Sequence, residues 1–181
     1  KVDNKILIAV ADCTGHGVPG AMVSVVCHNA LNRTIREFGI TDPGKILDKT
    51  RDIVIETFAR SNEEVRDGMD IAICEIDPWA RKLRYAGANN PIWITSEKAE
   101  LPVNSSKTEG YNIVKNSEVD TVYFLHEIKA DKQPIGKFYQ EDPFTTVEVQ
   151  LQENDTLYLT TDGYADQFGG PKKKKIKHKS I

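Results

Sequence analysis

The sequence has few cysteines and no long apolar run, and each shortage narrows the class of protein. Only three of the 181 residues are cysteine, without Cys-x-x-Cys spacing, so we interpret them as reduced core or near-site thiols and not as a disulfide framework. No segment approaches the roughly 18 apolar residues of a membrane-spanning helix, and no signal-peptide pattern opens the chain. We expect this domain to be cytoplasmic and to make no membrane contact of its own. A membrane anchor elsewhere in the parent protein would be compatible with this expectation.

The chain also lacks a charge excess of either sign. Its 24 Lys and Arg against 27 Asp and Glu leave a formal net charge of −3 at pH 7, which argues against nucleic-acid binding. The one basic run, 171–179, is interpreted as a solvated tail or the first turn of an exposed helix, with a nucleic-acid or acidic-membrane patch as the alternative. The length predicts a single domain, 1–181, large enough for a sizeable core.

Both ends of the sequence read as positions inside a longer protein. The chain opens on Lys1 without a methionine and enters an apolar strand pattern within a few residues. It closes on the basic run just after a turn. We therefore expect a domain that is truncated at both ends, with its first strand lacking the partner that would precede it.

Hydrophobic periodicity predicts an α+β fold. Apolar spacing predicts helices from Pro19 to about Phe38 and from about 43 to 58. The apolar positions of the first helix are Met22, Val25, Val26, Ala30 and Ile35. Alternating or continuous apolar runs predict strands at 6–11, 70–76, 82–86, 91–95, 121–127, 144–150 and 156–161. The polar stretch 96–117 is predicted to be a surface loop or insertion, within a variable region 96–132 where we expect partner specificity.

Two of the predicted strands end in an aspartate followed by a tight turn. The run 6–11 leads into Asp12 and a glycine-rich turn, and the run 156–161 leads into Asp162 and Gly163. An aspartate at the end of a buried strand is held rigidly, and flanking glycines let backbone carbonyls approach a cation. Carboxylate and carbonyl oxygens suit Mg²⁺ or Mn²⁺. The pattern predicts a metal-dependent hydrolase.

Five ordered motifs, covering nearly the whole chain, extend this hypothesis. They are Asp12-Cys13-Thr14-Gly15-His16-Gly17, Asp67-Gly68-Met69-Asp70, Gly87-Ala88-Asn89-Asn90-Pro91, Gln133-Pro134-Ile135-Gly136 and Thr160-Thr161-Asp162-Gly163. Together they resemble the stage II sporulation protein E (SpoIIE) branch of the PPM-type, protein phosphatase 2C-like, serine/threonine phosphatases. The resemblance implies an α-β-β-α sandwich, two antiparallel β-sheets flanked by helices, with a two-metal centre at one edge. It also implies hydrolysis of phosphoserine or phosphothreonine on a regulatory protein in bacterial signalling.

Phosphomonoesters hydrolyse very slowly unaided, and two divalent cations about 3.5–4 Å apart would lower the pKa of a bridging water and clamp the phosphoryl oxygens. The resemblance implies two ions, Mn²⁺ or Mg²⁺, in the complete domain. It assigns Asp12 as a bridging ligand, with Asp162 and the backbone carbonyl of Cys13. Asp70 is favoured over Asp67 as a further ligand because it abuts the apolar strand. The last candidate is Asp166, either a water-mediated ligand or a helix-start residue.

Other residues of these motifs have two interpretations each. His16 is a candidate general acid or a turn residue that packs on the helix. Asn89 and Asn90 are candidates for substrate binding or for a plain left-handed turn. For Gly15 and Gly17 the alternatives are a phosphate cradle at the helix N-terminus and tight backbone packing, and we prefer packing.

The resemblance also implies partners and a missing ligand. Expected partners are a phosphorylated regulatory protein, for instance of the anti-anti-sigma type, and sensory domains upstream in the same chain. A further metal-binding aspartate is implied on a strand before Lys1, so the chain alone is expected to bind one ion weakly or none, and need not be active.

Two other classes compete with the phosphatase. A catalytically inactive phosphatase-like binding module is the main alternative. Retention of several mutually repelling carboxylates argues against it. A nuclease is disfavoured by the acidic charge balance and by the lack of a basic, aromatic-bearing groove signal.

Overall fold

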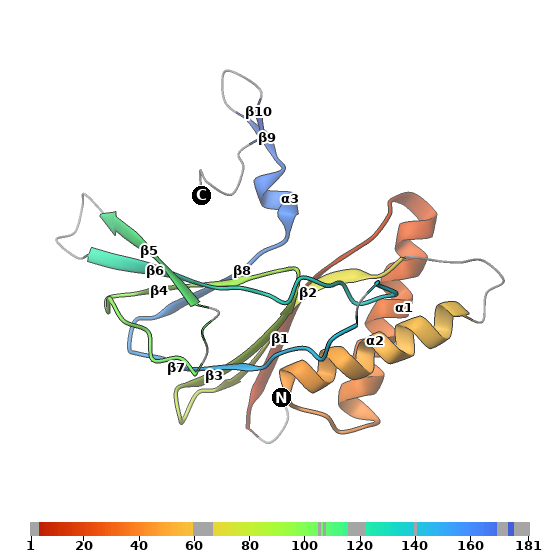
Figure 1. Ribbon diagram of the computed structural model, residues 1–181, viewed down its shortest axis with the longest axis horizontal. Coiled ribbons are helices and arrows are strands. Elements are labelled where there is room, and N and C mark those ends of the chain that lie inside the picture. The colour runs from red at the N-terminus through yellow and green to blue at the C-terminus, as the bar shows by residue number, and fades with distance from the viewer. Residues whose placement is uncertain are drawn as a thin grey trace.

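The computed structural model describes residues 4–59, 67–104, 106, 108–115, 122–139, 141–169 and 174–175. Within these ranges the chain forms two four-stranded sheets, a short two-stranded ribbon and three helices. In Figure 1 the two long helices lie together at one side of the molecule and the second sheet lies at the other. The first sheet therefore forms the middle layer, between the helices and the second sheet.

The first sheet consists of β1 (Ile6–Cys13), β2 (Met69–Asp77), β3 (Lys82–Ala88) and β7 (Val147–Gln150), in the order β1-β2-β3-β7. All three strand pairs are antiparallel. Helices α1 (Gly17–Arg36) and α2 (Pro43–Ala59) pack against each other and against this sheet. α2 begins directly after Asp42, whose carboxylate accepts a hydrogen bond from the Lys45 backbone N–H at 3.1 Å, as expected of a helix N-cap.

The second sheet has the order β5-β6-β4-β8 and is also antiparallel. Its strands are β5 (Thr108–Lys115), β6 (Val122–Ile128), β4 (Ile92–Ser96) and β8 (Thr156–Leu159). After β8 the chain forms the one-turn helix α3 (Asp162–Ala165) and the ribbon of β9 (Phe168–Gly169) with β10 (Lys174–Lys175). The fold is thus the expected pair of antiparallel sheets with helices packed on them.

The strand β2 is buried on both faces and supplies two cores. Ile71 and Ile73 point into the cluster shared with α1 and α2, whereas Ala72 and Cys74 point into the cluster between the two sheets. Successive side chains of a strand face opposite sides, so one continuous apolar run serves both layers. This double burial explains why the 70–76 segment reads as an apolar run without a polar face.

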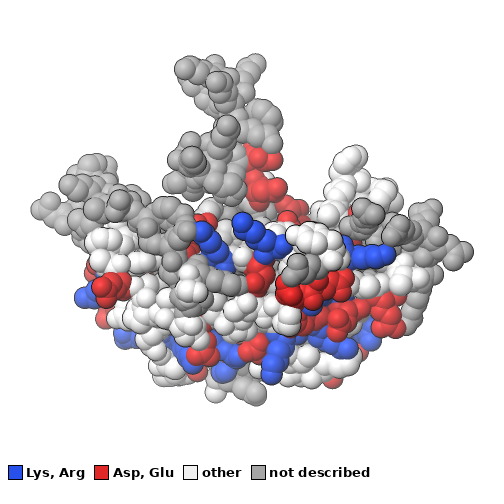
Figure 2. All heavy atoms as spheres, viewed as in Figure 1, with Lys and Arg blue, Asp and Glu red and all other residues white. Residues whose placement is uncertain are grey.

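Charged side chains are spread over the surface. On the face shown in Figure 2, basic and acidic groups are interspersed, and acidic groups gather over α2. Among the residues described, no helix combines the length and apolar character needed to cross a bilayer. The described part of this face shows no continuous basic surface, in keeping with the nearly balanced charge.

Two sequence expectations for local structure are wrong. The stretch 96–117 is predicted to be a surface loop or an insertion, and the loop alternative is wrong because β5 occupies 108–115 and pairs with β6. Cross-strand pairing supplies the backbone partners there, so an apolar pattern is not required. The region 96–132 therefore contributes two strands to the second sheet, and its status as a variable region stays a prediction.

Most of the basic run 171–179 lies outside the described residues, and Lys174 and Lys175 belong to the β-ribbon, not to a tail or helix.

The buried face of α1 also differs from the expected one. Met22 and Val25 are 62% and 54% exposed, whereas Val23 and Cys27, which were not among the expected positions, are buried; Ala30 is buried as expected. The first turn of α1 explains this rotation because Gly20 packs directly on the backbone of Gly15, where a Cβ atom at Gly20 would come within 2.7 Å of the Gly15 carbonyl carbon. That contact presses the glycine face of the helix against the turn after β1.

We expect alanine substitutions to report this burial. Leu47→Ala removes a side chain that is fully buried beneath α1 and the first sheet and should lower the free energy of unfolding by about 2–5 kcal/mol. Met22→Ala should change it by no more than about 0.5 kcal/mol, since that side chain is largely exposed. Urea denaturation of both variants tests the assignment, and equal losses would contradict it.

Candidate functional site

Three aspartates from separate segments line one cavity at the edge where the two sheets meet. Asp12 lies near the end of β1, directly opposite Asp70 of β2 in the strand register. Asp162 follows β8 of the second sheet and begins α3. All three line a cavity of about 460 Å³. The other described residues around it are Cys13, Thr14, Asn89, Asn90, Pro91, Trp93, Thr160 and Thr161.

Two of the three carboxylates, Asp12 and Asp70, have pKa values raised by burial and by neighbouring negative charge. Partial burial raises the pKa of Asp12 above its ordinary value, and the charge of Asp162, a hydrogen bond with Asp162 and the charge of Asp70 raise it further. Burial raises the pKa of Asp70 as well; a hydrogen bond from Asn89 opposes this shift and the charge of Asp162 adds to it. The cavity is therefore a region of negative potential that favours a positive charge.

Two asparagines complete the wall beside Asp70. The Asn89 side-chain Nδ2 donates to Asp70 Oδ1 at 2.8 Å, while the Asn89 backbone adopts a left-handed conformation with φ of 59°. Asn90 is buried, and its carbonyl accepts a hydrogen bond from the Tyr85 hydroxyl at 2.6 Å. Its side-chain Nδ2 has no hydrogen-bond partner among the described residues. Asn89 thus orients Asp70, and Asn90 carries a free donor at the cavity.

Asp67, the other candidate in its motif, is held differently. Its Oδ1 accepts a hydrogen bond from the Thr14 hydroxyl at 3.0 Å, and it is not among the described residues that line the cavity. The next residue, Gly68, donates its backbone N–H to Thr14 Oγ1 at 3.0 Å and packs so closely on Ile135 that no Cβ atom fits. Asp67 therefore ties the turn before β2 to the turn after β1, and Asp70 faces the cavity.

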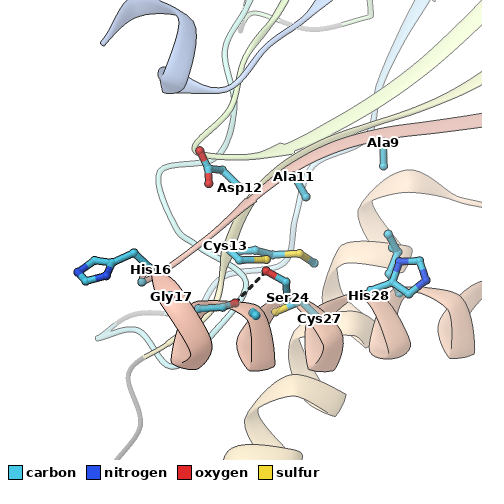
Figure 3. Close-up of a pocket in the computed structure, with 14 residues that line it drawn as sticks. Ala9, Ala11, Asp12, Cys13, His16, Gly17, Ser24, Cys27 and His28 are labelled. Carbon is cyan, nitrogen blue, oxygen red and sulfur yellow. Dashed lines mark hydrogen bonds between the residues drawn. The ribbon is translucent and has the colours of Figure 1, made fainter. Parts of the chain in front are cut away.

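The residues after Cys13 surround a neighbouring hollow of about 610 Å³ between β1 and α1. Gly15, His16 and Gly17 line this hollow, as do Asp12 and Cys13. His16 occupies the N-cap position of α1 without making a side-chain capping bond. In Figure 3 its ring points away from Asp12, and His16 is not among the described residues that line the cavity of the three aspartates.

The remaining candidates lie around these two spaces. In Figure 3, Cys13 points toward Cys27 on α1 and Asp12 points to the opposite side of the strand. Burial, followed by the neighbouring Cys13, raises the pKa of Cys27 to about 12, which describes a protonated thiol. Asp166 is exposed and its backbone N–H donates to the Asp162 carbonyl at 2.8 Å. It is absent from the described lining of the aspartate cavity.

Sequence reasoning missed Trp93 and Thr14. Trp93 lines the aspartate cavity, and its indole Nε1 donates to Glu127 Oε1 at 3.2 Å. Thr14, in the turn after β1, joins that turn to the turn that carries Asp67. Thr14 lies inside the first motif, and Trp93 lies two residues after Pro91, the last residue of the third motif. Their position relative to these motifs was the sequence signal that could have identified them.

The donor set suits a hard cation. The cavity offers carboxylate oxygens from three aspartates, the ligand type that Mg²⁺ and Mn²⁺ prefer. In the described part of the chain, no three His, Cys, Asp or Glu side chains already stand close enough together to hold an ion. Mutual repulsion of charged carboxylates keeps such groups apart unless a cation lies between them. The chemistry of the donors therefore fits a divalent cation.

The two-sheet sandwich with acidic residues at its edge defines the class of PP2C-like phosphatase domains. The solved SiaA-PP2C domain of Pseudomonas aeruginosa superposes with a TM-score of 0.72 and 26% identity, over 99% of this chain and 59% of that chain. The family model described as Stage II sporulation protein E (SpoIIE) matches residues 2–110, and the chain belongs to this family.

A curated relative and a further solved structure are also similar to this chain. Phosphoserine phosphatase RsbP of Bacillus subtilis (strain 168) is 25% identical over 161 residues, which are 88% of this chain and 33% of that protein. A stage II sporulation E family protein from Thermanaerovibrio acidaminovorans shares the fold, with a TM-score of 0.57 and 13% identity over 91% of this chain and 79% of that chain. The chain thus spans about a third of the length of its curated relative.

We expect the raised carboxyl pKa values to make the metal-free protein more stable when the site is protonated. An aspartate whose pKa rises on folding contributes stability below its ordinary value of 3.8 and loses that contribution as the pH rises through the folded-state pKa. In a chelator, Asp12→Asn should therefore raise the thermal midpoint at pH 7 and have no such effect near pH 3.5.

Thermal unfolding between pH 3.5 and 8 measures this difference. Glu153→Gln, at an exposed turn residue, is the matched control and should leave the pH profile unchanged. An Asp12→Asn protein that is less stable than wild type at pH 7 would contradict the assigned repulsion.

Proposed function

We propose that this domain is a Mn²⁺- or Mg²⁺-dependent protein serine/threonine phosphatase that hydrolyses phosphoserine or phosphothreonine on a regulatory protein. The observation that carries the proposal is the meeting of Asp12, Asp70 and Asp162, from three separate segments, around one cavity. Family membership and the phosphoserine phosphatase name of the relative RsbP support it. Divalent cations at such a site lower the pKa of water and offset phosphate charge.

The aspartates would hold the cations, each from a different element. Asp12 lies opposite Asp70 in the strand register and lines the same cavity as Asp162, which suits a shared ligand. Asp70 is kept in one orientation by Asn89. The carbonyl of Cys13 lies beside Asp12 at the end of β1 and is the backbone oxygen that we assign to the same site. Asp67 and Asp166 are left as weaker candidates.

Substrate phosphate would be bound by a neutral donor. Asn90 Nδ2 is a buried donor without a partner among the described residues, and Asn90 lines the cavity. Because an unpaired buried donor is costly, an incoming phosphate oxygen would satisfy it. The ring of Trp93 forms part of the same wall and would contact the substrate chain beside the phosphorylated residue.

A catalytically inactive binding module remains the competing function. It would need no cation, and it would gain nothing from carboxylates that repel one another. Retention of all three aspartates around one cavity supports the enzyme. Phosphopeptide binding without turnover, in the presence of Mn²⁺, would favour the binding module.

The partners and location belong to the proposal as well. The chain spans only part of RsbP and of the SiaA-PP2C chain, so we propose that sensory domains accompany it in a longer protein. An anti-anti-sigma-type protein is the proposed substrate. The three free cysteines are compatible with the reducing cytoplasm, where we place the domain.

We expect the full-length protein to hydrolyse p-nitrophenyl phosphate with Mn²⁺ and to lose that activity in chelator. Asp12→Asn or Asp162→Asn should lower kcat/KM about a thousandfold, because charge stabilisation by a bound cation is worth several kcal/mol and each ~1.4 kcal/mol is tenfold. Initial rates with Mn²⁺ present measure the loss.

Two comparisons sharpen this experiment. Asp70→Asn should lose more activity than Asp67→Asn, because Asp70 alone of the pair lines the cavity. Glu153→Gln should behave as wild type. Wild-type rates in both Asp12→Asn and Asp162→Asn would end the metal-centre assignment.

A further inference from the structure

Residues 131–136, here called the bracing segment, bind the backbone of two strands at the candidate site. The Asp131 N–H donates to the Gly87 carbonyl at 3.0 Å, and the Asn89 N–H donates to the Asp131 carbonyl at 2.9 Å. At its other end, Ile135 and Met69 exchange N–H···O bonds of 2.9 and 3.0 Å. The segment therefore fixes the Asn89 turn and the start of β2 at the same time.

Both contacts bear on Asp70. Met69 directly precedes Asp70 in β2, and Asn89 donates its side-chain hydrogen bond to the Asp70 carboxylate. A shift of the bracing segment would move the backbone beside Asp70 and the amide that orients it. The bracing segment is thus in a position to determine where this carboxylate points, although it does not itself line the described cavity wall.

The bracing segment is anchored to α2 by a buried arginine. Arg51 is only 7% exposed, and its guanidinium donates to Gln133 Oε1 at 3.3 Å and to the Asp142 carbonyl at 2.9 Å. It also pairs with Asp48 at 3.2 Å. The guanidinium carbon lies 4.9 Å from the centre of the Phe144 ring. All these partners hold one side chain in one position.

Gln133 closes this network around the Asp142 backbone. Its Nε2 donates to the Asp142 carbonyl at 2.7 Å, and its Oε1 accepts from the Asp142 N–H at 3.1 Å. Gln133 is 5% exposed, so a lost partner would leave a polar group buried. Because a lysine ammonium lacks the planar fork that reaches several acceptors at once, arginine suits this position better than any other cation.

We propose that Arg51 is a positioning residue, which acts through Gln133 and the bracing segment to hold Asp70 and the Asn89 turn in place. The inference rests on the proposed function for its effect on catalysis. Arg51 lies on α2, and α2 contributes no described residue to the aspartate cavity. Its role is therefore transmitted through the backbone contacts at Met69 and Asn89, and it touches neither substrate nor cation.

The test uses Arg51→Met and Gln133→Met in the full-length protein, with Arg33→Met as the matched control. Arg33 is exposed on α1 and pairs with Glu37 inside the same helix. Both test variants should lower Mn²⁺ affinity, measured by calorimetry, and kcat toward p-nitrophenyl phosphate by ten- to a hundredfold, as expected for residues that support a metal ligand. The double variant should be little worse than either single one, because the two residues act as a unit.

Hydrogen exchange gives a readout that does not depend on catalysis. The amides of Met69, Asn89 and Ile135 should exchange at least tenfold faster in Arg51→Met and Gln133→Met than in wild type, at a temperature where circular dichroism shows each protein folded. If Arg51→Met fails to fold, Gln133→Met carries the test alone.

The outcomes separate the two proposals. Folded variants with a lower thermal midpoint but with wild-type exchange at these three amides, wild-type Mn²⁺ affinity and wild-type kcat would overturn the positioning role. Wild-type activity in Asp12→Asn would instead overturn the proposed function, and the exchange rates would still decide whether Arg51 holds the bracing segment.

Discussion

Mutual repulsion among Asp12, Asp70 and Asp162 is the constraint around which the rest of this domain is arranged. Burial and neighbouring negative charge raise the pKa of Asp12 and Asp70, so the folded chain holds these groups together at a free-energy cost. The two cores on either side of β2 supply the rigidity that offsets it. A divalent cation bound among the three carboxylates would offset this repulsion, and carboxylate oxygens are suitable ligands for such a cation.

The strand register converts this constraint into a site. Antiparallel pairing places Asp12 of β1 opposite Asp70 of β2, and the end of β8 brings Asp162 from the second sheet to the same cavity. Hydrogen bonds from Asn89 and from the turn at Thr14 then hold the surrounding loops. Because each aspartate comes from a different segment, the relative position of the two sheets determines the site as much as any single motif does.

Local patterns predicted the parts of the structure that local chemistry decides. Strand, aspartate and tight turn are consecutive in sequence, so Asp12 and Asp162 could be found without the fold. The buried face of α1 could not, because it depends on the contact of Gly20 with Gly15 across a turn. The strand β5 could not be predicted either, because it lies in a polar stretch and depends on pairing with β6. The link from Arg51 to Asp70 runs through a side-chain hydrogen bond to Gln133 and then through backbone bonds between distant segments. The motif at 133–136 marked this segment in the sequence, but not its pairing with Arg51.

Anomalous X-ray diffraction from crystals of the full-length protein grown with Mn²⁺ tests the central claim most directly. The account predicts an anomalous peak within coordination distance of Asp12, with Asp70 and Asp162 as its neighbours, and the loss of that peak in Asp12→Asn crystals. The account would be contradicted if no anomalous peak appeared in the cavity at a saturating Mn²⁺ concentration. It would also be contradicted by a peak beside Asp67 and not beside these three carboxylates.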